Sequence, residues 1–115
     1  MRVSAESKEK MKAKYSREQL LAIRDQSIVY QCACPAQVST LMSEMRALYD
    51  YQENCLNESD VDVQVHQRIA SATSEAYLVI EQCLTDVLHL EGWNPATLEM
   101  PERLRNKLLK QISEA

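Results

Sequence analysis

Residues 35–56 read PAQVSTLMSEMRALYDYQENCL, and this stretch decides the fold. Its stripe positions repeat at steps of three, one and three residues; they are Val38, Leu41, Met42, Met45, Leu48, Tyr49, Gln52, Cys55 and Leu56. A seven-residue repeat of this kind predicts an amphipathic α-helix, and about 22 residues of helix span roughly 33 Å. Because proline disfavours the helical conformation of the residue before it, we expect the helix to begin at Pro35, directly after Cys34.

A second long helix is predicted from about residue 60 to residue 91. Asn57 or Ser59 is the expected N-cap, and Gly92, the only glycine of the chain, is well placed as the C-cap. A short polar connection separates this helix from the first one, so we expect the two to be antiparallel neighbours. The expected core stripe of residues 60–91 is Val65, Ile69, Ala72, Ala76, Ile80, Cys83, Val87 and Leu90, widened by Tyr77, Leu84 and Leu88.

Shorter helices are predicted on either side of this pair. Ser16 and Gln19 have the spacing of a capping box, which starts a helix that runs to about residue 30. Pro101 opens a last helix with Leu104, Leu108 and Ile112 on one face. One glycine and three prolines provide few of the turns that β-sandwiches and barrels need. The predicted fold is therefore all-α: a small helical bundle built on a long antiparallel helical hairpin with shorter N- and C-terminal helices.

The charge is unevenly distributed. The chain of 115 residues has a formal net charge of −4, yet residues 1–14 hold five basic side chains and only two acidic ones. We expect 1–14 to be a flexible basic N-terminal arm and 15–115 to be a single helical domain. An acidic body disfavours nucleic-acid binding, although the basic residues within 101–112 leave DNA recognition as an alternative.

The sequence also bears on the compartment. No stretch approaches the roughly 20 apolar residues of a membrane span, and the N-terminus lacks the apolar segment of a signal peptide. We therefore expect no membrane partner and a cytoplasmic location, where the four cysteines would be reduced.

Three of the cysteines could lie close together. If the chain reverses near residue 58, Cys83 faces the corner that carries Cys32 and Cys34. Soft thiolates select zinc or copper(I), and a thiol at a helix N-terminus is acidified, so these three residues form a candidate metal or redox site. The C-x-C spacing differs from that of common zinc sites, which favours thiols that simply pack between helices. Cys55 is expected in the core.

Two aromatic residues are candidates for contact with a partner. Tyr51 lies off the apolar stripe of its helix, and Trp93 follows Gly92 in an irregular segment, where it either pins the last helix or meets a partner. No glycine-rich phosphate loop, H-E-x-x-H motif or nucleophile–base pair is visible, so we expect neither catalysis nor a bound cofactor.

The sequence thus leads to two functional hypotheses. The first is a small, non-catalytic helical protein-interaction module of bacterial type, an adaptor or regulator that binds a protein partner, a second copy of itself, or both. The second is a thiol-based redox sensor or a zinc or copper sensor that uses Cys32, Cys34 and Cys83.

Overall fold

The computed structural model describes residues 11–29 and 33–106, which contain helices and turns but no strand. The main elements are α2 (Arg17–Val29), α3 (Ala33–Asn54) and α4 (Asp60–Glu91). Residues 102–106 add a short helical stretch. The prediction of an all-helical chain is therefore confirmed for this part of the sequence, while Leu108 and Ile112 lie outside it.

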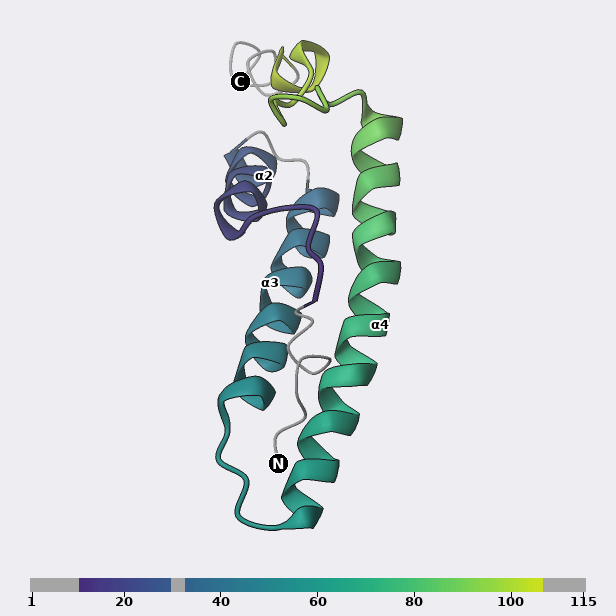
Figure 1. Cartoon of the computed structure of the whole chain (residues 1–115). Helices are drawn as coiled ribbons and strands as arrows, with labels where there is room; N and C mark the ends of the chain where they lie inside the picture. Colours follow the sequence, from purple (N-terminus) through teal and green to yellow (C-terminus); the bar gives the residue numbers. More distant parts are fainter. Residues whose placement is uncertain (1–10, 30–32, 107–115) are drawn as a thin grey trace.

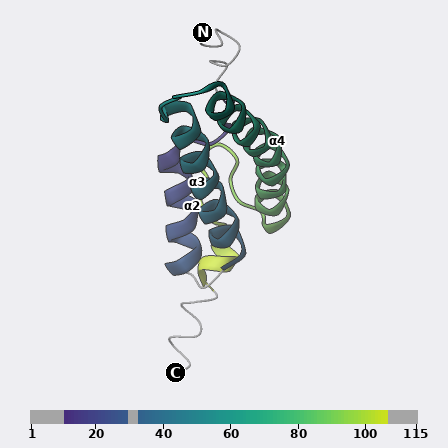
Figure 2. The same cartoon turned by 90° about the horizontal axis from the view of Figure 1, so that it is seen from below.

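The helices form a long and narrow body. Helix α2 packs on α3, and α3 packs on α4. Figure 1 shows α3 and α4 side by side, with the chain reversing its direction between them, and the segment after α4 returning over the end where α2 lies. Figure 2 shows α2 and α3 close together and α4 to one side of them. The principal extents are 63 × 25 × 18 Å, and the radius of gyration of 18.0 Å exceeds the roughly 13 Å expected for a compact domain of about this size.

The helix ends follow local rules of backbone hydrogen bonding. The predicted capping box is present: Ser16 N donates to Gln19 Oε1 at 2.8 Å, and Gln19 N donates to Ser16 Oγ at 3.0 Å. Ser59, one of the two predicted N-caps, accepts a hydrogen bond from the backbone of Asp62 at 3.1 Å. At the other end of α4, Gly92 has a φ of 86°, the left-handed conformation that favours glycine.

The predicted beginning of α3 is wrong by two residues. The helix starts at Ala33 rather than at Pro35, so Cys34 is already helical. Proline is tolerated here because the backbone N–H groups of a first turn have no partner within the helix. Its restriction on the preceding residue is a preference, which this helix overrides.

The core lies where α2, α3, α4 and the segment after α4 meet. Its members include the buried side chains of Leu20, Ile23, Met42, Tyr77, Leu84, Trp93, Leu98 and Met100. Gln26 of α2 holds the returning segment with both ends of its amide. Its Nε2 donates to the carbonyl of Leu98 at 2.9 Å, and its Oε1 accepts from the backbone of Met100 at 2.8 Å.

The predicted core face of α4 is confirmed only for Tyr77, Leu84 and Leu88, the residues that were expected to widen it. The buried residues of α4 are Ala70, Thr73, Tyr77, Glu81, Leu84 and Leu88. The side chains expected to form the main stripe are exposed or half-buried instead, and Leu90, for example, is 79% exposed. Ile80, also of that stripe, packs against the core. The segment before α2 fixes this rotation, because the backbone N–H of Lys14 donates to Glu81 Oε2 at 2.7 Å and the hydroxyls of Tyr15 and Thr85 are 2.7 Å apart.

Candidate functional site

The outward side of α3 carries a row of exposed side chains at helical spacing. We call Gln37, Leu41, Glu44, Leu48 and Tyr51 the α3 outer face; all five are exposed. Their steps of four, three, four and three residues place them on one side of the helix, over about 21 Å. Leu41 and Leu48 were expected in the core, so their exposure is a second departure from the predicted stripes.

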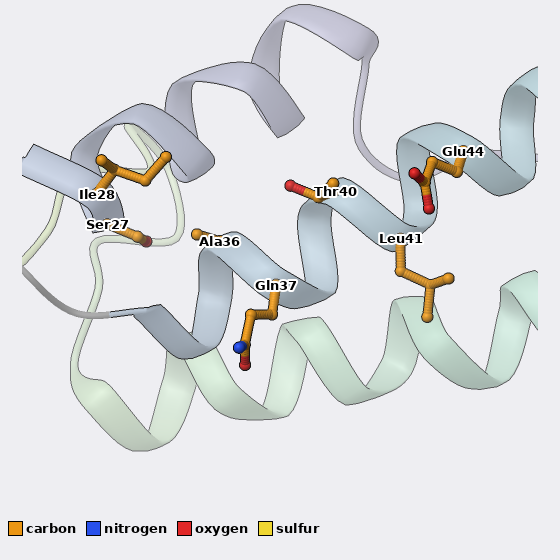
Figure 3. A pocket seen from close by; sticks show the side chains of 7 residues that line it. All are labelled: Ser27, Ile28, Ala36, Gln37, Thr40, Leu41 and Glu44. Atoms are coloured by element: carbon orange, nitrogen blue, oxygen red, sulfur yellow. The ribbon is translucent and has the colours of Figure 1, made fainter.

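A hollow of about 590 Å³ adjoins one end of the α3 outer face. It lies between α2 and α3 and is lined by Ser27, Ile28, Ala36, Gln37, Thr40, Leu41 and Glu44. Figure 3 shows Ser27 and Ile28 on α2 across from Ala36 and Thr40 on α3, with Leu41 pointing toward α4. This hollow can accept apolar side chains beside a carboxylate, the chemistry of a groove for an amphipathic helix.

Helix α4 carries a second row of outward apolar side chains. We call this set the α4 outer stripe: Val61, Val65, Ile69, Ala72, Ala76, Val79, Cys83, Val87 and Leu90, each exposed or half-buried. At about 100° per residue, these positions centre roughly a third of a turn from the buried face that contains Tyr77 and Leu84. No charged or hydrogen-bonding side chain other than the cysteine thiol interrupts the stripe.

The cysteines are free thiols where the structure describes them. Cys34 in the first turn of α3 and Cys83 in the α4 outer stripe are both exposed, and Cys55 is half-buried. Cys32 lies outside the described residues, so the predicted proximity of three thiols stays a prediction. Within residues 11–29 and 33–106, no group of three or more His, Cys, Asp or Glu side chains is arranged to hold a metal ion.

The two aromatic candidates occupy different environments. Tyr51 is 65% exposed and belongs to the α3 outer face. Trp93 is only 4% exposed, packs in the core, and donates from Nε1 to Glu91 Oε1 at 2.8 Å. Its position corresponds to the packing role considered for it, in which it pins the segment after α4.

A partly buried polar cluster, which sequence reasoning missed, lies at residues 14–15. In addition to the contacts of Lys14 with Glu81 and of Tyr15 with Thr85, Arg46 Nη1 donates to the carbonyl of Tyr15 at 2.5 Å. Each of these contacts joins residues that are far apart in the chain, so no local sequence pattern predicts them. The cluster ties the N-terminal segment to both long helices.

Two buried tyrosines have raised pKa values. Burial is the main cause for Tyr77, and the positive charge of Arg46 beside it opposes the rise of the pKa. Burial also raises the pKa of Tyr49, followed by repulsion from Glu53. The hydroxyl of Tyr77 has no hydrogen bond of normal geometry among the described residues. Both groups stay neutral at physiological pH, so they serve packing rather than proton transfer.

Comparison with known proteins does not identify a relative, so the function has to be inferred from the geometry of the site. No family model, no curated protein and no solved structure matches the chain. Within the described residues, none of the helices combines the length and the apolar character that crossing a membrane requires.

Proposed function

We propose that this protein is a non-catalytic protein-interaction module, an adaptor or regulator of the cytoplasm, built on a long antiparallel hairpin of α3 and α4. The observation that supports this proposal most directly is the α3 outer face, where Leu41, Leu48 and Tyr51 stay exposed next to the hollow. Contiguous exposed apolar surface of this kind marks interaction sites in soluble proteins.

The proposed partner element is an amphipathic helix. Its apolar side chains, spaced three or four residues apart, would enter the hollow between Ile28 and Leu41 and continue along Leu48. Glu44 favours a basic residue beside those anchors. Tyr51 offers a large amphipathic ring at the far end of the face, and tyrosine is enriched in binding hot spots.

Site-specific photocrosslinking in cells tests this surface. A photoreactive phenylalanine analogue that replaces Tyr51 is expected to capture a discrete partner of defined mass, and Leu48→Glu in the same chain is expected to abolish the adduct. The matched control places the same analogue at Gln67, an exposed position of α4. No adduct from position 51, or the same adduct from both positions, would refute the α3 outer face as the binding site.

A thiol-based sensor is the second candidate function, and the exposure of Cys34 and Cys83 supports it. In this proposal Cys32, Cys34 and Cys83 bind a zinc or copper ion or are oxidised. Protein purified without chelator is then expected to hold one equivalent of metal or to lose thiols on mild oxidation. Cys34→Ser and Cys83→Ser should remove either effect, while Cys55→Ser should preserve it. Four thiols that react as ordinary cysteines, with no metal bound, would end this candidate.

A further inference from the structure

We propose that the α4 outer stripe is the contact surface of an antiparallel homodimer, in which α4 of one copy lies along α4 of a second copy. This deepens the proposed interaction function by naming one partner, but it uses a surface separate from the α3 outer face. The two proposals can therefore fail independently.

The first argument is that α4 is apolar on two neighbouring faces and the chain buries only one. Tyr77 and Leu84 fill the buried face, whereas Val79 in the outer stripe is 69% exposed. The outer stripe extends from Val61 to Leu90, about 44 Å of helix. A helix with so wide an apolar arc is normally covered on both faces, and monomers rarely expose a continuous apolar surface of this extent.

The second argument is that the stripe is nearly symmetric about Ala76. Two helices that run in opposite directions and cross at Ala76 place residues of similar distance from the centre opposite each other. Val61 then meets Leu90 of the second copy, Val65 meets Val87, Ile69 meets Cys83, and Ala72 meets Val79. A two-fold dimer requires a self-complementary surface of this kind, and the small side chains at the crossing allow the helix axes to approach closely.

Charge complementarity selects the antiparallel direction. Arg68 and Asp86 flank the stripe on the same side, because 18 residues are about five full turns of helix. They lie at similar distances from Ala76, so an antiparallel pair brings Arg68 of each copy near Asp86 of the other. A parallel two-fold pair would place the two copies of this flank on opposite sides of the interface, so Arg68 and Asp86 would not meet. Glu75 lies on the same flank, one residue from the crossing, so the antiparallel pair also brings its two copies near each other; two Arg68–Asp86 pairs stand against this one repulsion.

Neither Arg68 nor Asp86 forms a salt bridge with another described residue. Within the described residues, the salt bridges join Arg17 to Asp50 and Arg24 to Asp25. Asp86 accepts one hydrogen bond, from the amide of Gln82 at 2.9 Å. The flanks of the stripe are therefore free to pair across the proposed interface.

Light scattering after size exclusion tests the surface. The reduced full chain is expected to elute with the mass of a dimer at micromolar concentration, and Val79→Glu is expected to convert it to a monomer. The matched control is Leu78→Glu, an exposed neighbour on the other side of the helix, which should stay dimeric. Circular dichroism checks that both variants keep their helix content. A monomeric wild type, or a dimeric Val79→Glu variant, would overturn the proposal.

Disulfide trapping tests the direction. In a chain whose four cysteines are replaced by serine, Ala76→Cys should form a covalent dimer on oxidation, because this position faces itself at the crossing. A chain that retains only Cys83 should not, because antiparallel packing separates the two copies of this residue by about 21 Å along the helix. A covalent dimer from the Cys83 chain as well would indicate a parallel pair, in which every residue of the stripe faces itself, and would overturn the antiparallel assignment. Failure of Ala76→Cys to form a covalent dimer would overturn it too. Photocrosslinking from Tyr51 reports on the α3 outer face whichever result is obtained.

Discussion

Leu84→Ala is expected to lower the free energy of unfolding by about 2–5 kcal/mol, the usual cost of removing a large apolar side chain from a packed core. Leu84 is fully buried in the core, on the same face of α4 as Tyr77. Leu78→Ala on the same helix is expected to change the free energy by no more than about 0.5 kcal/mol, since substitutions on the surface are usually small. Leu78 is the matched control because the two residues differ in burial and not in type.

Urea unfolding of both variants at one protein concentration measures this difference. The midpoint of the Leu84→Ala transition should fall while the slope of free energy against denaturant stays the same. A fixed concentration matters because dimerisation would add to the apparent stability. Equal losses in Leu84→Ala and Leu78→Ala would mean that the rotation of α4 described above is wrong.

The start of α2 and both ends of α4 could be predicted because their causes are local. Ser16 and Gln19 satisfy each other's backbone groups across three residues, and Gly92 adopts the one conformation that ends α4. Ser59 was one of two candidates for the N-cap, and a single hydrogen bond to Asp62 decides between them. Such signals depend on a few neighbouring residues, and the sequence contains all of them.

The rotation of α4 could not be predicted because its cause is not local. Periodicity shows that α4 has apolar residues over a wide arc, but it does not show which part of the arc meets the rest of the chain. Contacts with residues 14 and 15, about 70 positions earlier, turn Glu81 and Thr85 inward. The stronger heptad pattern faces outward, as expected of a surface that a second chain covers.

The candidate site was predictable only in part. Tyr51 could be identified as exposed because it lies off the stripe of its own helix. The hollow at the other end of the α3 outer face depends on where Ile28 of α2 meets Thr40 of α3, which helix spacing alone does not determine. Leu41 and Leu48 follow the apolar repeat of α3, yet a core built from few helices does not reach them. Because the body is elongated and its core is small, Leu41 and Leu48 lie on the surface although the sequence pattern places them in the core.

Raising the pH above 10 is expected to destabilise the protein through its buried tyrosines. The pKa of Tyr77 in the folded state lies above the ordinary tyrosine value of 10.0, and that of Tyr49 does too. Their contribution to stability is complete below pH 10 and is lost as the pH rises from there through the raised pKa values, because only the unfolded chain releases these protons easily. The loss can reach about 1.4 kcal/mol per pH unit for each proton.

Tyr77→Phe is expected to reduce the loss of stability per pH unit above pH 10, because one of the two buried phenols is no longer there to ionise. It also removes a hydroxyl that lacks a normal hydrogen bond, so stability at pH 7 should be unchanged or higher. Tyr51→Phe is the control, because it removes a hydroxyl from an exposed side chain rather than from the core. Urea midpoints measured in steps from pH 8 to about pH 11 give the slopes in the range where tyrosine ionises. If Tyr77→Phe followed the slope of the wild type while Tyr51→Phe departed from it, burial of Tyr77 would not be the source of the alkaline instability.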